Sequence, residues 1–248
     1  MPEGPSIVLV REELARFARR RVLRASGTAN IDLARLEGKS IRRFRSWGKH
    51  LLLDFGQFAI RIHFLMFGSH TVDHRKPRPE RLRLEFQHGD VNFYTCAVRE
   101  ISEPLDEVYD WGVDVLSDEW DATAARRRLR KHSDALICDA LLDQELFAGV
   151  GNIMKNEILF RTRVHPASRV AALPPAKLRA IVEQTRAYSF DFLAWKRAGV
   201  LKKHWQVHTR RTCPNCGGSL DKAHLGLTKR RTFWCERCQV RYERRRAQ

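Results

Sequence analysis

The chain has 248 residues, of which 43% are hydrophobic, and its formal net charge at pH 7 is +17. This length and apolar content exclude a wholly disordered chain and allow one large domain or two modest ones. No apolar run reaches the roughly 18 residues of a membrane span, and the start MPEGPSIVLVREEL lacks the features of a signal peptide. We therefore expect an intracellular protein (cytoplasmic, nucleoid-associated and bacterial) whose cysteines stay reduced.

The positive charge is concentrated near the end of the sequence. Residues 196–248 hold 15 Lys and Arg against 3 Asp and Glu, which is +12 of the total +17. This asymmetry favours a polyanionic partner such as nucleic acid over a uniformly basic surface, which remains the alternative. The last eight residues, RYERRRAQ, are set apart as a basic tail, for which disorder is one reading.

The first half of the chain predicts one helix followed by strands. Apolar residues recur at helical spacing from Ile7 through Leu23, so a helix is expected directly after the N-terminus. The next hundred residues contain short runs rich in β-branched and aromatic residues: HLLLDF, FAIRIHF, RLRLEF and VNFYTCAVREI. Because no helical segment separates these runs, an antiparallel sandwich or barrel is favoured over alternating strand–helix units.

From about Asp121 the pattern becomes helical again. Four segments carry it: ATAARRRLRK, ALICDALLDQELFAGV, NIMKNEILFRTRV and PPAKLRAIVEQTRAYSFDFLAWKR. We therefore predict an α+β fold, in which an antiparallel β-sandwich preceded by a helix is followed by a helical domain and a small cysteine module. The expected boundaries are 1–118 for the sandwich, 119–208 for the helical domain, 209–240 for the cysteine module and 241–248 for the tail.

The cysteines form the strongest local motif. Cys213-x2-Cys216 is followed, after 18 residues, by Cys235-x2-Cys238. In a reducing compartment this spacing indicates one structural Zn2+ held by four thiolates, which leave no open position for catalysis. Four unrelated buried cysteines are the alternative. The two remaining cysteines have no ligand spacing and are interpreted as buried thiols: Cys96 and Cys138.

The segment LTKRRTFWC lies between the two cysteine pairs and predicts two short strands. Its three cations, Lys229, Arg230 and Arg231, are expected at the turn. Because the module is too small to bury a core, we expect it to need its metal to fold and to present these cations rigidly. A merely solvated turn is the alternative.

The N-terminus offers an unusual nucleophile. Removal of Met1 from the Met-Pro start would leave Pro2 as a free secondary amine. An α-amino group has a pKa of roughly 8, against about 10.4 for lysine, so much more of it is unprotonated at neutral pH. Its attack on the anomeric carbon of a deoxynucleoside would give a cationic iminium that promotes elimination of the flanking phosphates. On the residues alone, however, PEGP is more often a tight turn.

Four segments occur in the order and spacing of one family: MPEGP, SWGKHLLLDF, LLDQELFAGVGNIMKNEILF and CPNCGG…KRRTFWCERCQ. Along its whole length the chain resembles the formamidopyrimidine-DNA glycosylase/endonuclease VIII family, and more closely its endonuclease VIII-like branch. The resemblance implies a base-excision repair DNA glycosylase with AP lyase (β,δ-elimination) activity on oxidised bases. It also implies a helix-two-turn-helix unit, a zinc finger, damaged DNA as the partner, and a monomer without a small-molecule cofactor.

The resemblance also implies roles for single residues. Pro2 resembles the family's Schiff-base nucleophile, Glu3 its general acid/base, and Lys49 the lysine that binds the phosphate beside the lesion. Asn152 resembles the residue that begins the second helix of the helix-two-turn-helix unit, where phosphate binds. Arg230 resembles the zinc-finger arginine that grips phosphate. The plain alternatives for the last three are an exposed strand-end lysine, a helix N-cap and a solvated turn.

The segment HFLMFG aligns with the family's loop that fills the space left by the extruded nucleotide. Leu65, Met66 and Phe67 are therefore candidates to insert into the DNA and sustain its kink. Without the resemblance, the alternation of apolar residues through this segment would indicate a core strand.

The sequence departs from the family pattern in three places. Ser6 stands where many relatives carry a second glutamate, so no role is expected for that carboxylate. Lys229 replaces the usual Gly or Gln before the finger arginine, which leaves the conformation of the turn open. The segment LKKHWQVHTRRTC is shorter than the capping loop of the branch that recognises 8-oxoguanine, which favours oxidised pyrimidines and abasic sites.

Several alternatives remain open at this point. The chain could prefer 8-oxoguanine or formamidopyrimidine lesions, or be a zinc-ribbon protein that binds lesions without catalysis. A zinc-dependent hydrolase is disfavoured by the closed set of four thiolates. Arg99 could approach the orphaned base opposite the lesion, although a strand-end cation is the simpler interpretation.

Overall fold

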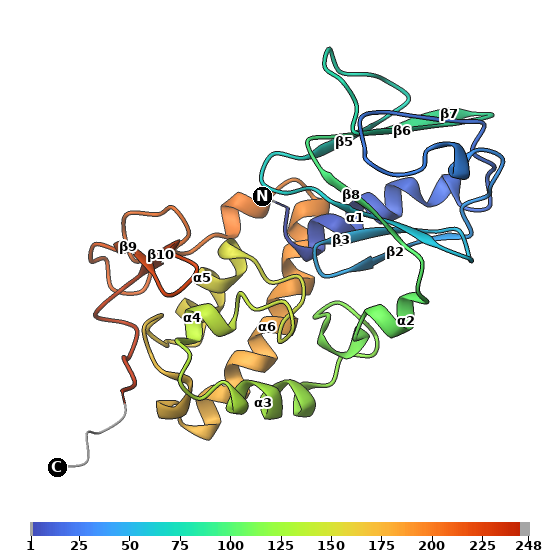
Figure 1. Cartoon of the computed structure of the whole chain (residues 1–248). Helices are drawn as coiled ribbons and strands as arrows, with labels where there is room; N and C mark the ends of the chain where they lie inside the picture. The colour runs from blue at the N-terminus through green and yellow to red at the C-terminus, as the bar shows by residue number, and fades with distance from the viewer. Residues whose placement is uncertain (1, 244–248) are drawn as a thin grey trace. The chain divides into compact units, whose positions relative to one another are not determined.

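The computed structural model describes residues 2–243 of the chain, which form two compact units (Figure 1). The N-terminal unit ends at Trp111, and the C-terminal unit begins at Gly112. None of the described helices combines the length and apolarity needed to cross a membrane. The expected boundaries of the finger and the tail stay predictions, and residues 244–248 of the basic tail lie outside the described residues.

The N-terminal unit contains two four-stranded antiparallel sheets, in the strand orders β1-β6-β7-β5 and β2-β3-β4-β8. The strands are β1 (Arg24–Ser26), β2 (Arg43–Trp47), β3 (His50–Asp54), β4 (Ala59–His63), β5 (Ser69–Val72), β6 (Leu82–Phe86), β7 (Gly89–Tyr94) and β8 (Ala97–Ile101). The helical segments are α1 (Gly4–Leu14), η1 (Ala15–Phe17), η2 (Ala34–Leu36), α2 (Leu105–Val108) and η3 (Trp111–Val113), the last crossing the unit boundary.

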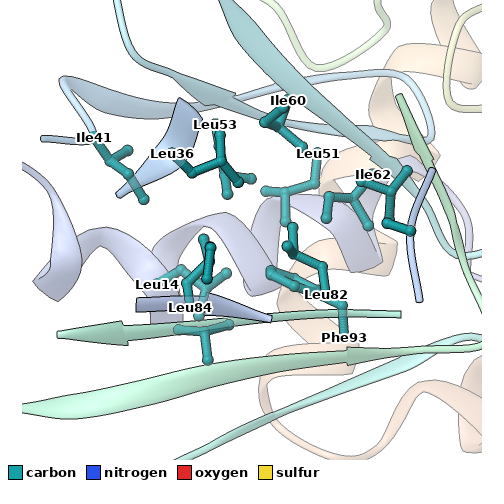
Figure 2. Close-up of a cluster of buried hydrophobic side chains, with 14 of the residues drawn as sticks. Leu14, Leu36, Ile41, Leu51, Leu53, Ile60, Ile62, Leu82, Leu84 and Phe93 are labelled. Atoms are coloured by element: carbon teal, nitrogen blue, oxygen red, sulfur yellow. The ribbon is translucent and has the colours of Figure 1, made fainter. Parts of the chain in front are cut away.

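The core of this unit lies between the inner faces of the two sheets. Alternate residues of the inner strands are apolar and buried, for example Leu51 and Leu53 on β3 and Leu82 and Leu84 on β6. Figure 2 shows Leu51 and Ile62 from one sheet pointing toward Leu82 and Phe93 from the other. Helix α1 contributes Leu14 to the same cluster. The predicted antiparallel sandwich with a preceding helix is confirmed.

The first helix is shorter than its periodicity predicted. It ends at Leu14, is followed by the short 3-10 helix η1, and the chain then turns at Arg19, whose φ is 64°. Beyond this point Val22 is fully buried, and its N–H donates to the carbonyl of Lys39. Val22 thus packs into the sandwich from extended backbone, where helical spacing does not apply, whereas Leu23 is exposed.

The run VNFYTCAVREI also forms two strands rather than one. Thr95 adopts a φ of 51°, which breaks the extended backbone between β7 and β8. Because β7 and β8 belong to different sheets, this break carries the chain from one layer of the sandwich to the other.

The C-terminal unit is helical and ends in a two-stranded hairpin. Its elements are α3 (Ala122–Lys131), α4 (Ile137–Ala140), α5 (Asn152–Arg161), η4 (Val170–Ala172), α6 (Pro175–Arg197), η5 (Leu201–His204), β9 (Asp221–Leu225) and β10 (Arg230–Trp234). Helix α3 begins where Asp121 accepts hydrogen bonds from the N–H groups of Thr123 and Ala124. These ranges closely match the predicted segments for α3, α5 and α6.

The segment 135–150, expected to be helical throughout, forms only the four-residue helix α4 before two turns. The side chain of Gln144 stabilises these turns by donating to the carbonyls of Leu142 and Val150 and accepting from the N–H of Gly149. Phe147 and Val150 are buried although they lie outside any helix. The order helix, two turns, helix from α4 to α5 confirms the predicted helix-two-turn-helix unit.

Candidate functional site

The N-terminal segment leads directly into the buried helix α1. Glu3 occupies the N-cap position with extended backbone and is only 1% exposed, and its carbonyl accepts from the N–H of Ser6 at 2.8 Å. Pro5 restricts the backbone of the first turn, where its missing N–H is not needed. Pro2 is half-buried immediately before this anchored turn, so its position is set by α1, whereas Met1 lies outside the described residues.

Lys49 lies in the two-residue turn that joins β2 to β3. Gly48 before it has a φ of 51°, which a tight hairpin turn requires, and the flanking residues Trp47 and His50 pair across the strands. The turn places Lys49 at the end of the hairpin, where the residue is half-buried rather than fully exposed. Its positive charge helps to lower the pKa of the neighbouring His63.

Two histidines beside Lys49 were not assigned from the sequence. His50 and His63 are paired in register on β3 and β4. Burial, followed by the charge of Arg61, lowers the pKa of His50 to about 3, and burial also lowers the pKa of His63. The hydroxyl of Tyr109 lies 3.3 Å from Nδ1 of His50. Both imidazoles are therefore neutral at pH 7, and the cationic groups of this cluster are Lys49 and Arg61.

The connection from β4 to β5 presents three consecutive apolar side chains to solvent. Leu65, Met66 and Phe67 are 45%, 51% and 78% exposed. The loop is tight, because the N–H of Gly68 donates to the carbonyl of Phe64 and a Cβ at Gly68 would lie only 2.1 Å from that oxygen. The strand alternation ends at His63, so Met66 is not the core residue that alternation alone indicated.

In the C-terminal unit, one face of α5 holds strand β10. The side-chain amide of Asn152 donates to the carbonyl of Arg231 at 2.8 Å. One turn later, Lys155 Nζ donates to Thr232 Oγ1 at 2.7 Å, and Asn156 Oδ1 accepts from the N–H of Phe233 at 3.2 Å.

Positions 152, 155 and 156 share a helix face at i, i+3 and i+4 spacing, so α5 fixes the start of β10 directly. The structure therefore brings the N-terminus of α5 and Arg230 together. The side-chain carbonyl oxygen Oδ1 of Asn152 is buried and has no hydrogen-bond partner within the described part of the chain.

The hairpin turn between β9 and β10 is anchored at its other side by Asp139. The carboxylate of Asp139 accepts from the backbone N–H groups of Leu227 and Thr228 at 3.0 and 3.3 Å. Lys229 adopts a φ of 44°, the left-handed conformation that glycine adopts most easily. Only Lys229 of the three expected cations lies in the turn, because Arg230 and Arg231 are the first residues of β10.

The four motif cysteines come together below this hairpin. Their sulfur atoms all lie within 4.8 Å of one another, with 3.7 Å between Cys213 and Cys238 and 3.6 Å between Cys216 and Cys235. A tetrahedron with metal–sulfur bonds of about 2.3 Å has edges of about 3.8 Å. The donor set therefore fits a tetrahedral metal ion with no position left for water.

The remaining cysteines and Arg99 can also be placed. Cys96 and Cys138 are buried, which confirms their interpretation as buried thiols, and burial raises the pKa of each to about 11. Arg99 lies in the middle of β8, opposite Arg61, rather than at the end of a strand.

Comparisons with known proteins agree with the order of the motifs. The model of the formamidopyrimidine-DNA glycosylase N-terminal domain matches residues 1–99, and that of the formamidopyrimidine-DNA glycosylase H2TH domain matches residues 111–188. Endonuclease 8-like 3 of Xenopus laevis is 31% identical over 231 residues, which are 88% of this chain and 38% of that protein. The chain thus spans little more than a third of the length of that relative.

Two further proteins are similar over nearly their whole length. The DNA-(apurinic or apyrimidinic site) lyase Nei2 of Mycolicibacterium smegmatis is 27% identical, and the match covers 97% of this chain and 99% of that protein. The solved structure of Lactococcus lactis formamidopyrimidine-DNA glycosylase, bound non-covalently to DNA containing an AP site, superposes with a TM-score of 0.82 at 22% identity. This match covers 96% of the present chain and 99% of that one, and it shows the shared fold.

Proposed function

Because this chain belongs to the formamidopyrimidine-DNA glycosylase/endonuclease VIII family, as its four motifs predicted, we propose that it excises oxidised bases from damaged DNA and then cleaves the strand as an AP lyase. The observation that carries the proposal is the start of α1. There Pro2 directly precedes the buried Glu3, within the segment that the N-terminal family model matches. The naming of a full-length relative as an AP lyase supports the second activity.

The proposed nucleophile is the secondary amine of Pro2 after removal of Met1. Its lone pair attacks C1′ of the damaged nucleotide, the C1′–N bond to the base breaks, and the base leaves with the proton that the amine gives up. The C1′–O4′ bond then breaks as O4′ takes up a proton, which leaves the opened sugar on the amine as an iminium. Loss of a C2′ proton then expels the 3′ phosphate, and a second elimination expels the 5′ phosphate. Glu3 is proposed to carry these protons, which its fixed position beside Pro2 supports.

We propose that phosphates of the DNA are bound by Lys49, Asn152 and Arg230. Lys49 stands at the end of a hairpin beside His50 and His63, whose pKa values are lowered by burial, so no imidazolium adds to its charge at pH 7. Asn152 is the first residue of α5, where helix N–H groups attract anions. Because each contact releases counterions, affinity is expected to fall steeply with salt. The exposed Leu65, Met66 and Phe67 are proposed to fill the space left by the extruded nucleotide.

The four cysteines are proposed to hold one structural zinc ion, which stabilises the finger and takes no part in the reaction. Reduced thiols of this kind fit the expected intracellular location. The measurement is zinc content per chain: one equivalent is expected, and its removal by a chelator is expected to abolish finger folding and DNA binding together.

We further propose a preference for oxidised pyrimidines and abasic sites. The connection from α6 to the finger is short and tied down, because the buried carboxylate of Glu157 accepts from the N–H groups of Gln206, Val207 and His208 at 2.9 to 3.0 Å. A segment that is short and fixed in this way cannot form a capping loop over a larger purine lesion.

A nicking assay on lesion-bearing oligonucleotides, with the product ends identified, tests the proposal. Oxidised-pyrimidine and abasic substrates are expected to be cut with a 3′ phosphate, the mark of double elimination. Lesion-selective binding without scission would instead indicate a non-catalytic lesion-binding protein, and cutting confined to 8-oxoguanine would reverse the proposed preference.

A further inference from the structure

A concave site lies on the N-terminal unit, at the opposite end of α1 from Pro2. It is a pocket of about 480 Å³ formed by the segment from Arg16 to Leu23 and by the turn between β6 and β7. Since a helix rises about 1.5 Å per residue, Arg16 lies about 20 Å from Glu3 along the axis of the helix. The pocket is therefore separate from the proposed nucleophile.

The pocket carries an unbalanced positive charge. Residues 15–24, ARFARRRVLR, contain five arginines and no acidic residue. Arg16 is paired with Asp73, but the exposed side chains of Arg19, Arg20 and Arg21 make no ion pair with any residue that the structure describes. Three guanidinium groups, each able to bind a carboxylate with two parallel hydrogen bonds, thus face solvent from one short segment.

The backbone of this segment is held in place before any ligand arrives. The N–H of Arg19 donates to the carbonyl of Ile41 at 2.6 Å, and that of Val22 donates to the carbonyl of Lys39 at 2.9 Å. Binding would therefore require ordering of side chains only, which lowers its entropic cost.

The pocket also has an apolar component. Leu23 is 56% exposed at its edge, and the rings of Phe17 and Phe86 stack at 4.6 Å beneath it. Both rings are almost fully buried, and the guanidinium of Arg16 lies 4.7 Å from the centre of the Phe17 ring. No open ring face remains for a nucleic-acid base to stack on. An apolar side chain, by contrast, can pack against Leu23.

We propose that this pocket binds a short acidic segment of a partner protein, whose carboxylates pair with Arg19, Arg20 and Arg21 and whose apolar side chain packs on Leu23. The volume suits one or two side chains of such a segment. Binding here would join the chain to another protein without occupying its proposed DNA-binding residues.

The test uses the full chain and a fluorescein-labelled synthetic peptide in which a run of aspartates is followed by two leucines. Fluorescence polarisation is expected to show saturable binding that weakens about tenfold or more in R20A/R21A. The matched control, R127A/R130A, removes two exposed arginines from α3 and is expected to bind the peptide like the wild type. Equal binding by R20A/R21A and the control would overturn the proposal.

A double-mutant cycle tests the apolar contact. L23S and a peptide with serines in place of its leucines should each weaken binding, and combining them should add little further loss. Full additivity, or no effect of L23S, would show simple charge attraction and overturn the proposal. Nicking of lesion DNA by R20A/R21A should stay within about twofold of the wild type. A parallel loss of nicking would place these arginines in the DNA contact surface instead, which would also overturn it.

Discussion

Lys155 on α5 donates a hydrogen bond to the hydroxyl of Thr232 on β10 across 2.7 Å, and both residues are only 1% exposed. A charged ammonium is thus sequestered between the helix-two-turn-helix unit and the finger hairpin. Such a buried charge is tolerated only while its hydrogen bonds are made. The position of Arg230, two residues before Thr232, therefore depends on this contact.

Removing the hydroxyl should destabilise the C-terminal unit. In T232V the ammonium of Lys155 loses one acceptor, at an expected cost of about 1–3 kcal/mol in the free energy of unfolding. The double variant K155M/T232V should cost less than the sum of the single variants, because no charge is then left without that acceptor. Urea denaturation of the zinc-loaded protein measures all three, and strict additivity would contradict the coupling.

The finger turn should become more stable with glycine at position 229. Lys229 adopts a φ of 44°, which costs a non-glycine residue roughly 1–2 kcal/mol. K229G and K229A remove the same charge, so they form a matched pair in which only K229G relieves the strain. K229G should therefore unfold at a higher denaturant concentration than K229A, while their affinities for DNA stay similar. A less stable K229G would show that the turn is not strained.

The N-terminal unit should lose stability on acidification because of His50. Burial lowers the pKa of its imidazole to about 3 in the folded chain, against an ordinary value of 6.5. Below pH 6.5 the unfolded chain therefore binds a proton at His50 that the folded chain does not bind. The free energy of unfolding is thus highest above pH 6.5 and falls progressively as the pH drops toward 3.

At pH 5 this loss is at most about 2 kcal/mol, since each unit of pKa difference is worth about 1.4 kcal/mol. The measurement compares unfolding of wild type and H50N between pH 7 and pH 5. H50N should show the smaller loss between these pH values. Identical pH dependence would mean that His50 is not held neutral by the fold.

Substitutions in the loop 64–68 should weaken DNA binding without lowering the stability of the fold. Because Leu65, Met66 and Phe67 are exposed, each substitution in the triple variant L65A/M66A/F67A should change the free energy of unfolding by less than about 0.5 kcal/mol. If these side chains enter the DNA, the variant should bind lesion duplexes about tenfold or more weakly, because the apolar insertion that offsets unstacking is gone. The comparison is with undamaged duplex, whose weaker binding should change little. Equal loss on both duplexes would argue against insertion.

The sequence predicted those features that depend on local chemistry. The C-x2-C spacing predicted the cysteine cluster, and apolar periodicity predicted α3, α5 and α6, whose ranges lie within the predicted segments. The first helix was overextended because buried residues of the sandwich edge, such as Val22, have the same apolar character as helix residues. Tertiary packing determines whether such a segment becomes helix or extended chain, and the periodicity of a single sequence does not contain this information.

The candidate site was likewise predictable only in part. Pro2, Lys49 and Asn152 could be chosen from short motifs that resemble a family. His50 and His63 become neighbours only through the register of β3 and β4. The hydrogen bonds from the finger turn to Asp139 join residues almost ninety positions apart. The alternation in AIRIH puts Arg61 and His63 on one face of β4, but the run of leucines in HLLLD gives no such signal for His50.

The most direct test of the account is borohydride trapping on DNA with an oxidised pyrimidine, followed by mass spectrometry of the digested adduct. The proposed chemistry predicts a sugar remnant on the amine of Pro2 in a chain that lacks Met1, and trapping by Pro2→Thr reduced by about a hundredfold. An adduct on a lysine, a trapped chain that retains Met1, or undiminished trapping by Pro2→Thr would contradict it.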